Sequence, residues 1–87
     1  MSLKDLQDKA DQIKQLISDL IFIKNDLNSS EIDEINRIKK SFDRVKQFYN
    51  NGALNENDAG MRLDNIIHQA SSLDRIISDR ISKQRGY

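Results

Sequence analysis

No proline interrupts this chain, and its three glycines fall only at positions 52, 60 and 86. Proline removes a helical hydrogen bond and glycine lowers helix stability, so few positions in the chain favour a break in a helix. Isoleucine and leucine recur at spacings of three and four residues, which is the period of one face of an α-helix. We therefore expect an all-α protein built from long helices.

The first helix is predicted over about residues 3–27. Ser2 stands at its N-cap position, and Asp5 three residues later forms a capping box in which Asp replaces the usual Glu. Apolar residues then recur in two heptad columns, which is the pattern of a coiled-coil seam. The first column holds Leu3, Ala10 and Ile17 before Lys24 interrupts it, and the second holds Leu6, Ile13, Leu20 and Leu27.

A second helix is predicted over about residues 31–50, after the break "NSS". Ser30 with Asp33 repeats the capping pattern at its start. At about 100° per residue, its apolar side chains span roughly 200° of the helix surface, a face wide enough to contact more than one neighbour. These side chains are Ile32, Ile35, Ile38, Phe42, Val45, Phe48 and Tyr49.

A third helix is predicted over about residues 56–83, with Asn55 at its N-cap and Asp58 three residues later. Ala70 and Ser71 form a small-residue position where another helix could approach closely. The apolar stripe of this helix consists of Ala59, Leu63, Ile66, Ile67, Ala70, Leu73, Ile77 and Ile81.

The segment "YNNGALNENDA" at residues 49–59 is rich in side-chain oxygen and has two interpretations. A calcium loop needs oxygen ligands at fixed offsets from a central glycine. With Gly52 at the centre one ligand position falls on Tyr49, and with Gly60 at the centre another falls on Ile66. Neither register supplies the ligands, so the sequence predicts a turn, with Gly52 in the left-handed conformation that ends many helices.

Both predicted connections are short, so consecutive helices should run antiparallel within one domain that spans residues 1–87. The three helices would form either an elongated closed bundle or a hairpin-like unit whose core is completed by oligomerisation. The third helix is predicted to outrun the second, which leaves residues 78–87 as an overhanging or frayed end.

Charge and residue usage exclude several classes of protein. The 14 basic and 14 acidic side chains cancel, so no global field attracts nucleic acid or an anionic membrane. Cysteine is absent, which excludes disulfides and thiol chemistry. The longest apolar run has only four residues, at positions 20–23, so we expect no membrane association and a cytoplasmic location. Abundant Ile, Lys, Asn and Asp indicates an AT-rich genome, such as that of a bacterium or a phage.

Asp64, His68 and Ser72 have the residue types of a catalytic triad and follow one another at four-residue spacing on one helix face. His68 lies about 180° from the centre of the apolar stripe, on a side that should face solvent without a pocket. We therefore expect no catalytic residues and no enzyme. His68 is the only histidine, and neither a metal nor another cofactor is predicted.

Arg37, Lys40 and Arg44 form a basic stripe on the outer face of the second helix and are candidates for contact with phosphate or an acidic partner. Asp33 and Asp43 lie at four-residue spacing from Arg37 and Lys39, which favours an ion-paired, solvated face instead. A second basic set near the C-terminus contains Arg75, Arg80, Lys83 and Arg85.

Phe22 points away from the apolar face of its helix, and Ile76 and Met61 also lie off the stripe of theirs. Exposed apolar residues on long amphipathic helices favour an interface with another chain. We predict a homodimer in which a second copy covers Phe22 together with Ile76, Ile77 and Ile81.

Two functional hypotheses follow. The first is a non-enzymatic protein–protein interaction module with a regulatory role, such as a small adaptor, assembly factor or inhibitor, that acts through amphipathic helical surfaces. The alternative is a nucleic-acid-binding accessory protein that uses the basic stripe of the second helix or the basic C-terminal end. Salt separates the two, because binding to phosphates weakens steeply as the ionic strength rises.

Overall fold

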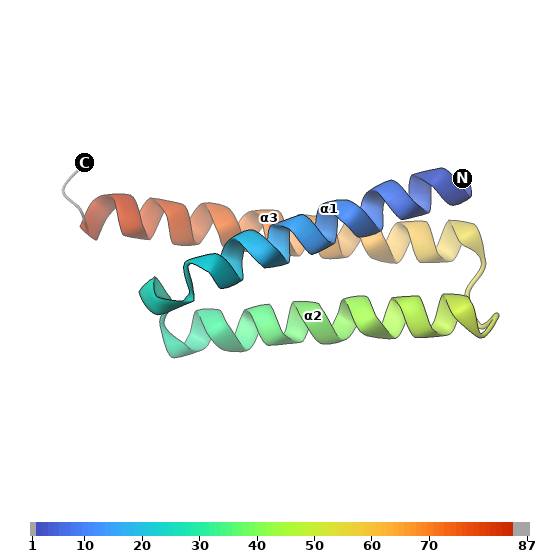
Figure 1. Ribbon diagram of the computed structural model, residues 1–87, viewed down its shortest axis with the longest axis horizontal. Coiled ribbons are helices and arrows are strands. Elements are labelled where there is room, and N and C mark those ends of the chain that lie inside the picture. The colour runs from blue at the N-terminus through green and yellow to red at the C-terminus, as the bar shows by residue number, and fades with distance from the viewer. Residues whose placement is uncertain (1, 85–87) are drawn as a thin grey trace.

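A computed structural model describes residues 2–84 and shows an all-α protein of three helices (Figure 1). They are α1 (Leu3–Phe22), α2 (Ser29–Asn50) and α3 (Glu56–Gln84), and a short 3-10 turn, η1 (Lys24–Asp26), follows α1. Each helix runs antiparallel to the preceding one, as predicted, so that α1 and α3 are parallel. The molecule is elongated, with extents of 48 × 20 × 16 Å.

The first helix begins at the predicted cap and ends earlier than predicted. The backbone N–H of Asp5 donates to Ser2 Oγ at 3.2 Å, and the N–H of Ser2 donates to Asp5 Oδ2 at 3.3 Å. The α-helix stops at Phe22 rather than near residue 27, because Asn25 and Asp26 carry short polar side chains that favour turns. Leu27 is extended, yet it still packs half-buried against the core.

The second helix begins at a different cap from the one predicted. Asn28 is the N-cap, and its Oδ1 accepts from the N–H of Glu31 at 2.8 Å, while Glu31 Oε1 accepts from the N–H of Asn28 at 3.0 Å. Ser30, the predicted cap, lies exposed inside the first turn. The complete capping box of Asn28 with Glu31 starts α2 at Ser29, two residues before the predicted start.

The turn between α2 and α3 has the predicted form. Gly52 adopts a φ of +86°, a conformation in which a Cβ atom would be strained. Asn55 caps α3, and its Oδ1 accepts from the backbone N–H of Asp58 at 2.8 Å. This bond satisfies a backbone donor that the start of a helix would otherwise leave unpaired.

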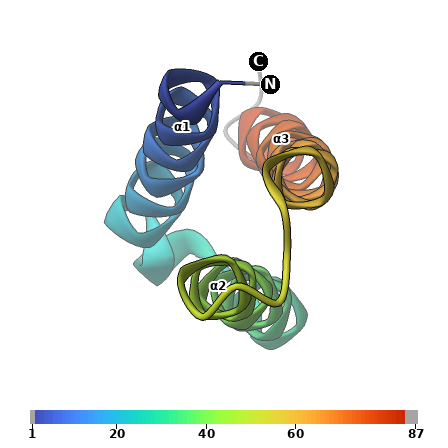
Figure 2. The ribbon, with the colours of Figure 1, turned by 90° about the vertical axis from the view of Figure 1, so that its right-hand side faces the viewer.

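The core lies along α3, which packs against both other helices, whereas α1 and α2 make few contacts with each other (Figure 2). From α1 the second heptad column enters the core, with Leu6, Ile13 and Leu20 almost inaccessible to solvent. Full burial of one such side chain contributes roughly 1.5 to 3 kcal/mol. The remaining core residues are Ile17, Ile35, Ile38, Phe42, Val45, Ala59, Leu63, Ile66, Ala70, Leu73 and Ile77.

The end of α3 corrects the prediction for Ile77. Ile77, expected at a dimer interface, is fully buried within the chain and has no accessible surface to offer a partner. Arg80, expected on an overhang, binds the side chain of Glu31 and the carbonyl oxygen of Asp26. The connection from α1 to α2 lies beside this part of α3, and the last turn of α3 projects beyond it (Figure 1). Residues 85–87 of the predicted overhang lie outside the described residues.

Candidate functional site

The seam between α1 and α2 does not close. The α1 side chains along it include Gln7, Ala10, Lys14 and Ser18, and those of α2 include Asn36, Lys39, Asp43 and Lys46. Charged and small side chains cannot interlock like the leucine and isoleucine side chains on α3, because their polar ends must stay in water. The two helices therefore lie side by side on α3 with a groove between them, which we call the α1–α2 groove.

The axes of α1 and α2 diverge toward the start of α1 and the end of α2 (Figure 1). A hollow of about 390 Å³ opens there. Leu3 and Tyr49 lie on its sides, and Ala59 and Leu63 of α3 contribute to its lining. Leu3 and Ala10 of the first heptad column line this hollow, and Leu3 is 61% exposed, whereas Ile17 of the same column is buried in the core.

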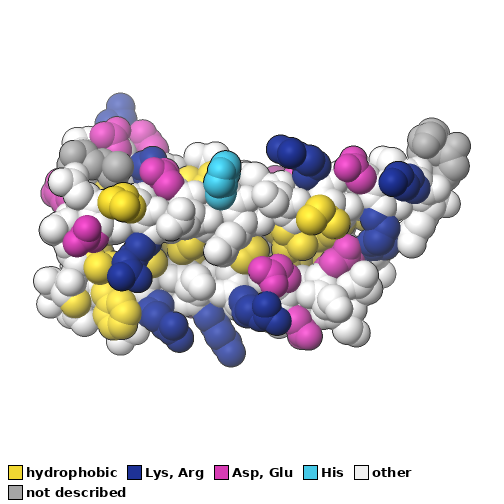
Figure 3. Space-filling view, turned by 180° about the vertical axis from the view of Figure 1, so that it is seen from behind, with side chains coloured by type: hydrophobic (Ala, Val, Ile, Leu, Met, Phe, Trp, Pro, Cys, Tyr) yellow, Lys and Arg dark blue, Asp and Glu magenta, His cyan; other side chains and the backbone are white. Residues whose placement is uncertain are grey.

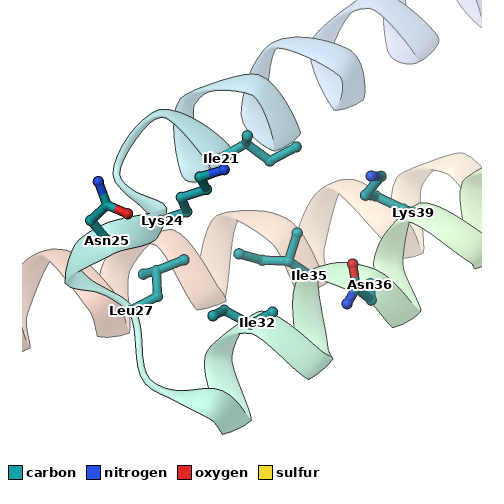
Figure 4. A pocket seen from close by; sticks show the side chains of 8 residues that line it. All are labelled: Ile21, Lys24, Asn25, Leu27, Ile32, Ile35, Asn36 and Lys39. Carbon is teal, nitrogen blue, oxygen red and sulfur yellow. The ribbon is translucent and has the colours of Figure 1, made fainter.

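Two further hollows continue the groove toward the connection between α1 and α2. The middle hollow is lined by Ile17, Ile21 and Phe42. The last hollow, shown in Figure 4, places Ile21 of α1 opposite Ile32 and Ile35 of α2, with Leu27 at the closed end. The groove therefore presents apolar side chains along its whole length.

Lysines border this apolar surface. Lys14 lines the middle hollow, Lys24 lines the last one, and Lys39 lines both. Within residues 2–84 these three lysines make no ion pair. Asp43 also lines the middle hollow, but it pairs with Lys46, whose Nζ lies 3.6 Å from Asp43 Oδ1 and 4.6 Å from the centre of the Phe42 ring. The border of the groove is therefore basic.

At the closed end of the groove, Arg80 fastens α3 to the start of α2. Its Nε donates to Glu31 Oε2 at 2.9 Å, and its second terminal nitrogen donates to Glu31 Oε1 at 2.5 Å and to the carbonyl oxygen of Asp26 at 2.7 Å. The Arg80 hydrogen bond lowers the pKa of the Glu31 carboxyl, and the same bond raises the pKa of Arg80. The sequence placed Arg80 only in a basic set, because no local pattern links it to Glu31, which lies 49 residues earlier in the chain.

The predicted basic stripe lies where the sequence placed it, with Arg37, Lys40 and Arg44 all exposed on α2. Arg37 pairs with Glu34 at 3.0 Å rather than with Asp33. The predicted pairing of Asp43 with Lys39 is also replaced, since Asp43 pairs with Lys46. On the face of the molecule drawn in Figure 3, basic side chains lie along the edge formed by α2, with acidic side chains among them.

Asp64, His68 and Ser72 follow one another on an exposed face of α3. Asp64 is bound by Lys9 of α1, and His68 is exposed on the surface (Figure 3). His68 and Ser72 line only an open hollow that they share with Glu34. Among residues 2–84, no group of three or more His, Cys, Asp or Glu side chains could hold a metal ion.

The apolar residues expected off the main stripes are exposed: Phe22 by 90%, Met61 by 65% and Ile76 by 61%. Ile81 is half-buried and packs against the core. Of the four predicted interface residues, Phe22 and Ile76 thus remain largely accessible to a partner.

Comparison of the chain with family models, with curated proteins and with solved structures found no match. Within residues 2–84, no helix is both long enough and apolar enough to cross a lipid bilayer.

Proposed function

We propose that this protein is a non-enzymatic protein–protein interaction module that binds a helical segment of a partner in the α1–α2 groove. The observation that carries the proposal is an apolar groove along a helix pair that does not close on itself. An amphipathic helix that lays its apolar face into such a groove is one of the recurring modes of peptide recognition.

The energetics of the groove support this proposal. Leu3 is 61% exposed, Ile21 41% and Ile32 40%, so each has apolar surface left to bury. Removing apolar surface from water contributes about 25 cal/mol per Å². A fourth helix on this seam would bury these residues and convert the three-helix unit into a four-helix arrangement, a common way to complete a helical core.

A capture experiment tests the proposal. The wild-type protein is immobilised and exposed to a lysate of its source cells, in parallel with the groove variant Ile21→Glu/Ile32→Glu. The control is Met61→Glu/Phe48→Glu, which introduces the same charge at exposed apolar positions that do not line the groove. We expect a protein to be retained by the wild type and the control but lost by the groove variant. Equal retention by all three baits would contradict the proposal.

The alternative function is nucleic-acid binding through Arg37, Lys40 and Arg44, which is favoured by their common exposure on one helix. The pairing of Arg37 with Glu34 weakens that surface as a phosphate site. Binding to DNA or RNA would decline steeply with salt and would be lost on replacing the three side chains by Gln. Binding through the α1–α2 groove would survive this replacement, because the three side chains do not line the groove.

A further inference from the structure

The α1–α2 groove combines an apolar lining with a basic border, and this combination specifies the chemistry of its occupant. Building on the proposed function, we infer that the occupant is an amphipathic helix of another protein that carries an apolar stripe with acidic residues on its flanks. The inference stands on the charge of the border, on the spacing of the hollows and on the way a second copy of this chain would fit.

The charge of the border is the first observation. Lys14 approaches from α1, Lys24 from η1 and Lys39 from α2, so cations lie on both sides of the groove. Lys46 and Asp43 pair with each other, so the net positive charge of the border comes from Lys14, Lys24 and Lys39. Glutamates flanking the stripe of a docked helix would lie next to these lysines, whereas lysines at the same places would meet like charges.

The spacing of the hollows is the second observation. Ile35, Phe42 and Tyr49 of α2 each line a different hollow, and they follow one another at intervals of seven residues. Seven residues of α-helix rise about 10.5 Å, so a parallel or antiparallel helix with one large apolar side chain per heptad would place one in each hollow. The three hollows together match about three heptads of a partner helix.

A second copy of this chain fits the groove poorly. A two-fold dimer through the groove would bring identical surfaces together, with Lys14 and Lys39 of one copy facing the basic border of the other. Insertion of a single helix from another copy is also disfavoured, because α1, α2 and α3 each use their main apolar stripe in the core of their own chain. The groove therefore calls for a helix with a different charge pattern.

Synthetic helices test the inference directly. Three peptides of about 21 residues carry the same leucine stripe over three heptads, with Glu, Gln or Lys at the flanking positions. A hydrocarbon staple on the outward face keeps the three equally helical. Fluorescence anisotropy at low salt measures their affinity for the full-length protein, and we expect the Glu peptide to bind about tenfold or more tightly than the Lys peptide.

The charge-reversed variant Lys14→Glu/Lys39→Glu should invert this preference and bind the Lys peptide more tightly. The control Lys40→Glu/Arg44→Glu makes the same charge change on exposed side chains that do not line the groove and should keep the wild-type order. Circular dichroism should be used to check that both variants remain helical.

Three outcomes would overturn the inference. Equal affinity for the Glu and Lys peptides would show that the partner helix needs no acidic flanks, although the groove would still be a binding site. If no peptide binds, the groove does not bind an amphipathic helix. The capture experiment would still decide separately whether the protein has a partner. Protection of the groove residues in the peptide-free protein, together with a dimeric mass, would assign the groove to a second copy.

Discussion

At the scale of single residues, Asn28 sets the start of α2 through two reciprocal hydrogen bonds with Glu31. Replacing an N-cap Asn by Ala typically costs about 1 kcal/mol, which lowers the Tm of a domain of this size by about 4 to 8 °C. We expect this loss for Asn28→Ala in a thermal melt. Ser30→Ala should leave the Tm almost unchanged, since Ser30 is exposed within the first turn. A larger loss of Tm for Ser30→Ala than for Asn28→Ala would show that Ser30 is the N-cap, as the sequence predicted.

Glu31 also makes the stability of the fold depend on pH. Its carboxyl has a lowered pKa because Arg80 donates hydrogen bonds to its charged form. A lowered folded-state pKa means that the stabilisation is present above the ordinary value of about 4.5 and is lost as the pH falls through the folded-state value. We expect Glu31→Gln to lower the Tm by a few degrees at pH 7, and the difference from the wild type to shrink below about pH 4.5.

The partner variant checks the assignment of this effect to one pair. Arg80→Gln should lower the Tm at pH 7 much as Glu31→Gln does, and the double variant should add little to either. Fully additive losses would mean that Glu31 and Arg80 stabilise the protein independently, contrary to the hydrogen bonds between them.

At the scale of the helices, two neighbouring isoleucines of α3 lie in different environments. Ile77 is fully buried, whereas Ile76 is 61% exposed. Truncating a buried isoleucine to alanine costs about 2 to 5 kcal/mol, and a surface change usually stays within about 0.5 kcal/mol. Urea unfolding should therefore show a much lower midpoint for Ile77→Ala than for Ile76→Ala. Similar midpoints for the two variants would show that Ile77 is not a core residue and would support its predicted place at an interface.

The helices themselves could be predicted because their signals are local. Heptad spacing, the Ser2 and Asn55 caps and the glycine at position 52 act within a few residues, and each has its predicted role in the structure. The groove and the Glu31–Arg80 pair could not be predicted in this way. Both depend on which side of α1 turns toward α2 and on how the connection after Phe22 lies against α3, and these are set by packing between distant segments.

At the scale of the whole molecule, the predicted self-association now rests on fewer side chains. Phe22 and Ile76 keep most of their surface exposed, while Ile77 is in the core and Ile81 is half-buried. Burying one such side chain fully contributes roughly 1.5 to 3 kcal/mol, and association costs an estimated 4 to 15 kcal/mol. Four side chains from two copies would therefore support only a weak dimer. Phe22 does not line the α1–α2 groove, so this contact and the groove are separate surfaces.

Light scattering over a range of protein concentrations tests this weak dimer. The average mass should rise above the monomer mass of 10.1 kDa as the concentration approaches about 100 μM or more. Phe22→Ser should restore the monomer mass without changing the affinity of the Glu peptide, because it removes apolar surface outside the groove. Met61→Ser, at a comparably exposed apolar position, should associate like the wild type. A monomer mass throughout for the wild type would contradict self-association and leave Phe22 as a contact for a different protein.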